Sequence, residues 1–124
     1  MPKVYITNPI PQNGVDILKH HGFNCDVNES GRDLTDDGLK KVVGDYDAVV
    51  SFLTDKIDSK IIDYASKKLK IIANYSVGYD NIDLEAATKR GIIVINAPDG
   101  NTITTCEHAF AMMMAVARHI PQAY

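Results

Sequence analysis

The residues best suited to bind or activate a small molecule lie in one segment near the middle of the chain. Asn74-Tyr75-Ser76-Val77-Gly78 follows an apolar run at residues 71–73, a pattern typical of a buried strand followed by a loop. A small hydroxyl residue and a glycine let backbone N–H groups approach a ligand closely, and such groups favour a carboxylate or a phosphate. A plain turn, with Asp83 capping the helix that follows, accounts for the same spacing.

A second segment with the same potential covers residues 96–102. It follows the apolar run at residues 92–95 and is rich in turn-forming residues. Its Asn101 could donate its side-chain amide to a ligand oxygen held by the first segment. Asn101 could equally cap the helix expected to begin there, and the sequence leaves both interpretations open.

The remaining candidates for catalysis or metal binding are less favoured. Glu107 and His108 are adjacent, and neighbouring residues on a helix point about 100° apart, so they do not form an acid/base pair. Glu107 is better explained by the capping-box pattern Thr104-Thr105-Cys106-Glu107, and His108 as a polar residue at the edge of the domain. Cys25 and Cys106 are far apart, without further ligands at metal-binding spacing, so we expect two buried thiols and no metal site.

Short apolar runs alternate with helix-length segments along the first hundred residues. This alternation predicts an α/β fold: an open parallel five-stranded sheet with helices on both faces. The expected strands are residues 4–6, 23–27, 48–50, 71–73 and 92–95, and the expected helices are residues 12–21, 35–43, 58–67 and 83–90. Gly22 and Gly91 stand where two of these helices should end. Ligands of such sheets bind at the carboxyl ends of the strands, where both segments lie.

The last expected helix, residues 102–120, differs from the others. Residues 109–117 are apolar on every face, and such a helix needs cover on all sides. We expect a second subunit, or residues beyond Tyr124, to bury it. The alternative is a core helix of the same domain. The run is too short for the roughly 20 residues that span a bilayer.

Composition restricts the classes of function. With 124 residues, 45% of them hydrophobic, the chain suffices for one domain with its own core. Its net charge of −3, without a basic cluster, argues against nucleic acid and membrane surfaces as partners. No signal-peptide pattern opens the chain, which favours a cytoplasmic protein. Neither G-x-G-x-x-G nor a P-loop occurs, so no standard loop binds a nucleotide in these residues.

Residues 69–124 resemble the D-isomer-specific 2-hydroxyacid dehydrogenases. The motifs that carry the resemblance are Ser76-Val77-Gly78-Tyr79-Asp80-Asn81-Ile82-Asp83, Ala86-Ala87, Arg90-Gly91-Ile92, Asn96-Ala97-Pro98, Asn101-Thr102 and Glu107-His108-Ala109. The resemblance implies a flavodoxin-like substrate-binding domain over residues 1–101. It implies that residues 102–124 form an interdomain helix leading to a Rossmann domain, which binds NAD or NADP and lies outside this chain.

The same resemblance implies roles for individual residues. Backbone amides of Ser76, Val77 and Gly78 would hold the carboxylate of a small 2-keto or 2-hydroxy acid. Asn101 would contact the substrate and Thr102 would lie near the cofactor. The catalytic Arg, Glu and His of the family are expected downstream of Tyr124, so we expect no catalytic residue here and an inactive isolated chain. A homodimer through the C-terminal helix region is also implied.

The resemblance points to two substrates. Residues 96–102 and 118–123 look like D-3-phosphoglycerate dehydrogenases, although these often carry an arginine at the position of Asn74. Residues 74–80 look more like glyoxylate or hydroxypyruvate reductases. The longer match favours the phosphoglycerate dehydrogenases, with the reductases as the alternative. A freestanding module that binds a carboxylate and signals through a partner is an alternative of another class.

Overall fold

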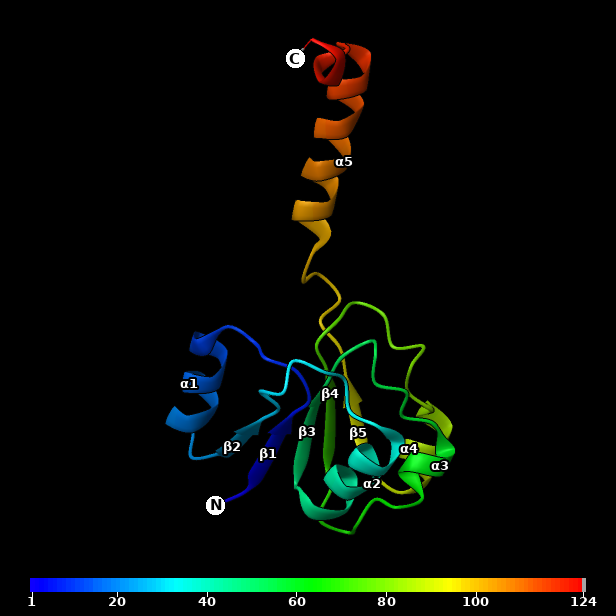
Figure 1. Ribbon diagram of the computed structural model, residues 1–124. Helices are drawn as coiled ribbons and strands as arrows, with labels where there is room; N and C mark the ends of the chain where they lie inside the picture. Colours follow the sequence, from blue (N-terminus) through cyan, green and yellow to red (C-terminus); the bar gives the residue numbers. More distant parts are fainter. Residues whose placement is uncertain (124) are drawn as a thin grey trace.

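The computed structural model, which describes residues 1–123, is built on five strands that are all parallel (Figure 1). The strands are β1 (Lys3–Ile6), β2 (Asn24–Val27), β3 (Ala48–Ser51), β4 (Ile71–Asn74) and β5 (Ile93–Ile95), in the spatial order β2-β1-β3-β4-β5. The predicted α/β fold with an open parallel five-stranded sheet is therefore confirmed. All five carboxyl ends lie at one edge of the sheet, since the strands share one direction.

The helices begin and end at residues whose chemistry explains those limits. They are α1 (Gln12–His20), α2 (Asp36–Asp45), α3 (Ser59–Ile62), α4 (Leu84–Lys89) and α5 (Thr102–Ala117), with a 3-10 turn η1 (Ile120–Gln122) after α5. Gly22 and Gly91 follow α1 and α4 with φ of 84° and 69°. Glycine adopts this left-handed backbone at no steric cost, so the expected helix ends are confirmed.

Helix α3 is shorter than the expected helix over residues 58–67. The guanidinium of Arg90 donates to the carbonyl oxygens of Asp63 (2.9 Å) and Ala65 (3.1 Å). The N–H of Ser66 donates to the Val43 carbonyl at 3.1 Å. These long-range bonds take the backbone groups that a longer helix would use, so tertiary contacts end α3 at Ile62.

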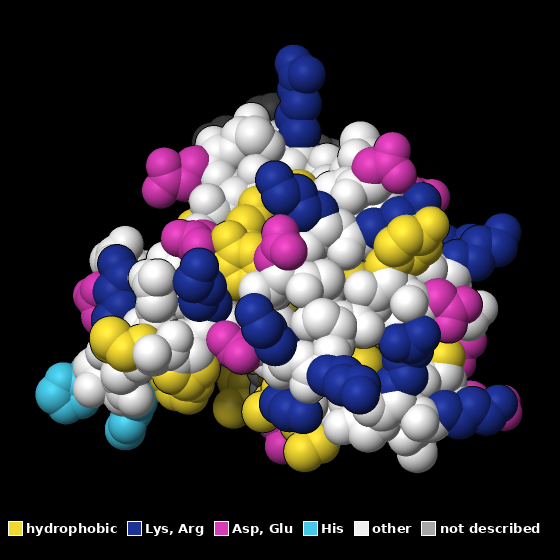
Figure 2. Space-filling model, turned by 90° about the horizontal axis from the view of Figure 1, so that it is seen from below, with side chains coloured by type: hydrophobic (Ala, Val, Ile, Leu, Met, Phe, Trp, Pro, Cys, Tyr) yellow, Lys and Arg dark blue, Asp and Glu magenta, His cyan; other side chains and the backbone are white. Residues whose placement is uncertain are grey.

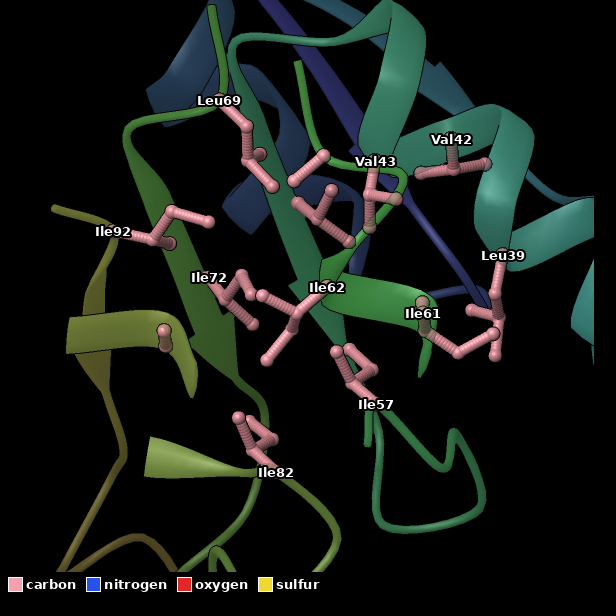
Figure 3. Close-up of a cluster of buried hydrophobic side chains, with 13 residues drawn as sticks. Leu39, Val42, Val43, Ile57, Ile61, Ile62, Leu69, Ile72, Ile82 and Ile92 are labelled. Carbon is pink, nitrogen blue, oxygen red and sulfur yellow. The ribbon is translucent and has the colours of Figure 1, made fainter. Parts of the chain in front are cut away.

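Side chains of the central strands alternate between two separate cores, as the period of two in a strand requires. Val49 and Ile72 join the larger core, which lies under α2, α3 and α4 (Figure 3). Val4 and Ile6 join the smaller core under α1. Helices therefore cover both faces, as predicted. The face on the α1 side is covered incompletely, because Ile93 and Ile95 of β5 remain 59% and 51% exposed.

Helix α5 projects away from the sheet and packs on neither core (Figure 1). Phe110, Met113 and Val116 are 61%, 61% and 70% exposed. The interpretation of this segment as a core helix of the same domain is therefore wrong, and its apolar side chains are available to pack against another surface.

Cys106 is exposed and Cys25 is only partly buried, so the expectation of two buried thiols is also wrong. None of the helices within residues 1–123 has the length and apolarity needed to cross a membrane.

The start of α5 also differs from the expected capping box. The residue that precedes the helix is Asn101, and Thr104 already lies inside it. The Thr104 hydroxyl donates to the Asn101 carbonyl oxygen at 3.1 Å. A capping residue precedes the first turn of its helix, and Thr104 is instead the third residue of α5. The capping box over residues 104–107 is therefore wrong.

Charge is spread evenly over the end of the molecule opposite α5. Figure 2 shows Lys and Arg side chains interspersed with Asp and Glu over this face. Among the described residues, several charged side chains pair directly, such as Lys89 with Glu85 at 2.6 Å. This view gives no continuous surface of one sign.

Candidate functional site

The two segments that the sequence analysis singled out meet at the carboxyl ends of β4 and β5. The N–H of Ala97 donates to the carbonyl oxygen of Ser76 at 2.9 Å. The side-chain amide of Asn96 donates to the carbonyl oxygen of Val77 at 2.7 Å. One loop therefore holds the backbone of the other.

A pocket of about 410 Å³ lies beside this junction. Its lining comes from the loops after β3, β4 and β5: Leu53, Tyr75, Ser76, Val77, Gly78, Ala97, Gly100 and Asn101. All four residues expected to bind substrate are in this list, although they come from two distant parts of the chain. Thr102, expected near a cofactor, is exposed at the first position of α5, beside Asn101. The structure brings the candidates together, and their ligand stays a prediction.

The backbone N–H groups of the β4 loop are not equivalent. The N–H of Ser76 donates to the carbonyl oxygen of Asn74 at 2.8 Å. Within residues 1–123, the N–H groups of Val77 and Gly78 have no hydrogen-bond acceptor. Val77 is 38% exposed and Gly78 is partly exposed, so a ligand can reach both. Among the pocket-lining residues of this loop, two backbone N–H groups are therefore without an acceptor, where we expected three available donors.

Asn101 is also free to bind a ligand. It occupies the position before α5, but its side chain makes no capping hydrogen bond. The interpretation of Asn101 as a side-chain cap is therefore wrong. The first turn of α5 adds unpaired N–H groups and the positive end of a helix dipole beside the same pocket.

The lining of the pocket carries no charged side chain. Leu53 and Tyr75, which are 56% and 50% exposed, form an apolar wall. The Tyr75 ring packs on Phe52, with ring centroids 5.1 Å apart. An anion in this pocket would therefore find backbone N–H groups and one side-chain amide in the lining, and no cationic side chain.

Comparison with known proteins identifies the chain. Residues 4–123 match the family model "D-isomer specific 2-hydroxyacid dehydrogenase, catalytic domain". The chain belongs to this family. It is 47% identical over 119 residues to a glyoxylate reductase of Pyrococcus furiosus, covering 96% of this chain and 35% of that protein. It is also 47% identical over 123 residues to a D-3-phosphoglycerate dehydrogenase of Synechocystis, covering 99% of this chain and 21% of that protein.

A solved structure shares the fold of this chain. The crystal structure of the TT0316 protein from Thermus thermophilus superposes with a TM-score of 0.87 and 36% identity. The superposition covers 98% of this chain and 38% of that one. This dehydrogenase-family chain thus spans about a third of the glyoxylate reductase and about a fifth of the phosphoglycerate dehydrogenase.

A buried cluster of polar side chains lies beneath the loops that line the pocket of this dehydrogenase-family domain. Asn74 is 3% exposed, and its side-chain oxygen accepts from the Ser51 hydroxyl at 2.9 Å. Its side-chain nitrogen donates to the Asn81 side-chain oxygen at 3.0 Å. The Asn81 amide donates in turn to the carbonyls of Phe52 (3.0 Å) and Asp55 (2.9 Å). This cluster joins the β3 loop to the β4 loop.

Asp55 lies deeper, at 1% exposure. One of its carboxylate oxygens accepts from the Phe52 N–H at 2.8 Å and from the Thr7 hydroxyl. Sequence analysis missed Thr7, Asp55, Asn81 and the side chain of Asn96. A polar residue ending an apolar strand could have indicated Asn74. No local pattern indicates that Thr7 and Asp55, which are 48 positions apart, would meet.

A second depression lies between α3 and α4, away from the carboxyl ends of the strands. Its charged side chains include Asp63, Glu85, Lys89 and Arg90. They already pair with each other, Lys89 with Glu85 at 2.6 Å and Arg90 with Asp63 at 3.3 Å. Among the described residues no group of three His, Cys, Asp or Glu could hold a metal ion. The pocket lined by Val77 and Gly78 is therefore the stronger candidate for a ligand site.

Proposed function

We propose that this chain is the substrate-binding domain of a D-2-hydroxyacid dehydrogenase that interconverts a small 2-keto acid and its D-2-hydroxy acid. Residues 1–101 form the substrate-binding domain. Residues 102–124, whose helix α5 spans Thr102–Ala117, connect this domain to a nucleotide-binding domain outside the chain. Membership of the family supports the reaction class.

One observation carries the proposal. Val77 and Gly78 carry adjacent N–H groups without acceptors among residues 1–123, and both residues line a pocket that Asn101 also lines. Two adjacent backbone donors suit the two oxygens of a carboxylate, and hydrogen bonds to a charged acceptor are the strong ones. The nearby amino end of α5 favours the same negative charge.

The contribution of this domain to the reaction is orientation. With the carboxylate held on Val77 and Gly78, the adjacent keto carbon has a restricted position over the pocket. Fixing a reactant in this way contributes several kcal/mol to catalysis, about 7 or more in well-oriented systems. The arginine that polarises the keto group and the histidine that donates the proton are family residues expected downstream of Tyr124.

NAD or NADP is the cofactor that the family resemblance implies, and it would supply the hydride. Thr102 is the residue of this chain proposed to lie against it. Thr102 is exposed at the start of α5, next to the substrate pocket, so its position fits a cofactor bound beside that pocket. Most of the cofactor contacts belong to the proposed second domain.

For the specific substrate, the sequence similarity of residues 96–102 and 118–123 supports 3-phosphohydroxypyruvate, the keto acid of a phosphoglycerate dehydrogenase. Two observations favour glyoxylate or hydroxypyruvate as the second candidate. The pocket lining contains no cation that could pair with a phosphate. Asn74, at the position where phosphoglycerate dehydrogenases often carry arginine, is buried beneath the loop, where its side chain binds the protein rather than a ligand.

The test is turnover by the full-length parent protein with glyoxylate, hydroxypyruvate and 3-phosphohydroxypyruvate, followed by nicotinamide absorbance with NADH and with NADPH. We expect the parent to reduce at least one of them and the isolated chain to reduce none. The preferred substrate then decides between the two candidates. Inactivity of the parent on all three would contradict the dehydrogenase and favour the freestanding carboxylate-binding module.

A further inference from the structure

Asn96 is not among the residues expected to touch the substrate, but its side chain binds the backbone of Val77, which is one of them. It follows β5, and its amide nitrogen donates to the carbonyl oxygen of Val77 at 2.7 Å. That carbonyl belongs to the same peptide group as the N–H of Gly78. A trans peptide is planar, with its C=O and N–H pointing in opposite directions, and residues 1–123 contain no cis peptide. Holding the Val77 carbonyl therefore aims the Gly78 N–H away from Asn96.

We propose that Asn96 is a positioning residue for the substrate carboxylate, acting by fixing the Val77–Gly78 peptide so that its N–H faces the pocket. This inference rests on the proposed function, because it assumes that a carboxylate binds there. Asn96 itself does not line the pocket. It acts through the backbone of its neighbour.

The preceding peptide group, between Ser76 and Val77, is held in the same manner, but by a backbone donor instead of a side chain. The Ala97 N–H donates to the Ser76 carbonyl at 2.9 Å, which aims the Val77 N–H. Consecutive residues, Asn96 and Ala97, thus hold consecutive carbonyls and orient both free donors. Only the Asn96 bond depends on a side chain, so a substitution there disturbs one of the two donors.

Glycine makes this restraint necessary. A peptide group preceding glycine can rotate at small cost, because glycine lacks the Cβ that restricts φ. Without the Asn96 bond, the Val77–Gly78 peptide can turn its carbonyl toward the pocket, where it would repel a carboxylate. Asparagine can donate here, whereas aspartate at neutral pH can only accept and adds a negative charge. We therefore expect Asn96→Asp to be more damaging than Asn96→Ala.

The experiment is an amide-resolved NMR titration of this chain with oxamate, a stable analogue of a 2-keto acid. In the unsubstituted chain the Val77 and Gly78 amide signals should shift in a saturable way. Asn96→Ala should weaken binding about tenfold, the scale of one hydrogen bond to a charged group, and Asn96→Asp should weaken it further. Asn13→Ala and Asn13→Asp, at an exposed asparagine of α1, are the matched controls and should bind as the unsubstituted chain does.

The outcomes separate this inference from the function on which it rests. No shift of Val77 and Gly78 in the unsubstituted chain would refute the carboxylate site and, with it, the role of Asn96. Binding in the unsubstituted chain and equal binding by Asn96→Ala would refute only the role of Asn96. Thermal unfolding midpoints complete the test. A midpoint unchanged from that of Asn13→Ala, together with weaker binding, supports positioning, whereas a large fall in the midpoint would indicate a structural role instead.

Discussion

The side-chain nitrogen of Asn74 lies 2.8 Å from the carbonyl oxygen of Gly78. This bond ties the last residue of β4 to the loop that carries the two free backbone donors. Since Asn74 is almost completely buried, the loop is anchored from inside the protein while its other side faces the pocket. Together with the bonds from Asn96 and Ala97, every carbonyl of residues 76–78 accepts a hydrogen bond.

Removing the Asn74 side chain should destabilise the domain. Asn74→Ala leaves the Ser51 hydroxyl and the Asn81 amide with fewer partners in a buried setting, which costs about 2–4 kcal/mol of unfolding free energy. Urea denaturation measures this loss. The control is Asn24→Ala, at an exposed position of β2, which should change the free energy of unfolding by less than about 0.5 kcal/mol. Equal effects of the two substitutions would contradict the anchoring role.

Gly78→Ala should leave the fold intact and abolish carboxylate binding. A Cβ on Gly78 would lie 3.6 Å from Leu53 Cδ2, an ordinary van der Waals distance. Both residues line the pocket, so the added methyl group would occupy space that the ligand needs. We expect an unfolding midpoint close to that of the unsubstituted chain and no saturable NMR shifts with oxamate. Gly44→Ala, with the same 3.6 Å clearance in α2, should retain binding, and retained binding by Gly78→Ala would refute the placement of the ligand.

Asn101 and Asp83 both precede helices, yet their substitutions should differ. Asp83 accepts from the Ala86 N–H at 2.9 Å, so Asp83→Ala should cost about 1 kcal/mol of unfolding free energy through loss of a cap. Asn101 makes no such bond, so Asn101→Ala should weaken oxamate binding and leave the free energy of unfolding nearly unchanged. Urea denaturation of both variants tests this. A loss of stability in Asn101→Ala comparable to that in Asp83→Ala would show that Asn101 serves as a cap.

Tyr46 should ionise only at strongly alkaline pH. Burial raises its pKa from 10.0 to about 12, assisted by its hydrogen bond to the Asp26 carboxylate. A pKa raised on folding means that the stabilisation is complete below the unfolded value and is lost as pH rises through the folded value. Tyr46 should therefore support stability up to about pH 10 and lose that contribution by about pH 12. Alkaline titration of tyrosinate absorbance should show a late transition that Tyr46→Phe removes and that Asp26→Asn moves to lower pH. If the late transition persisted in Tyr46→Phe, it would belong to another group, and the assignment to Tyr46 would be wrong.

Self-association of the chain should depend on α5. Its exposed apolar side chains include Phe110 and Val116, and burying such surface yields about 25 cal/mol per Å². We expect sedimentation velocity to show association that increases with concentration. The double variant Phe110→Asp, Val116→Asp should be monomeric, whereas Ile17→Asp, at an exposed position of α1, should associate normally. An unsubstituted chain that is monomeric at high concentration would contradict the proposed dimer.

The sequence by itself determined the class of fold and the region of the site. Alternation of apolar runs with helix-length segments depends on local periodicity, so it predicted five parallel strands and their order along the chain. It also placed residues 74–78 and 96–102 after two strands, hence at one edge of the sheet. The family resemblance then supplied roles for Ser76, Val77, Gly78 and Asn101.

Only the tertiary structure decided which groups are free to act. Whether Ser76 or Gly78 offers its N–H depends on which carbonyl lies nearby, and Asn96 reaches Val77 across 19 positions of sequence. In the same way, Arg90 ends α3 by taking carbonyls that helix periodicity assigned to the helix. The exposure of α5 likewise depends on what surrounds it, not on its own pattern. Local patterns specify strands and loops because they arise between close neighbours, while hydrogen-bond partners between distant segments exist only once the chain has folded.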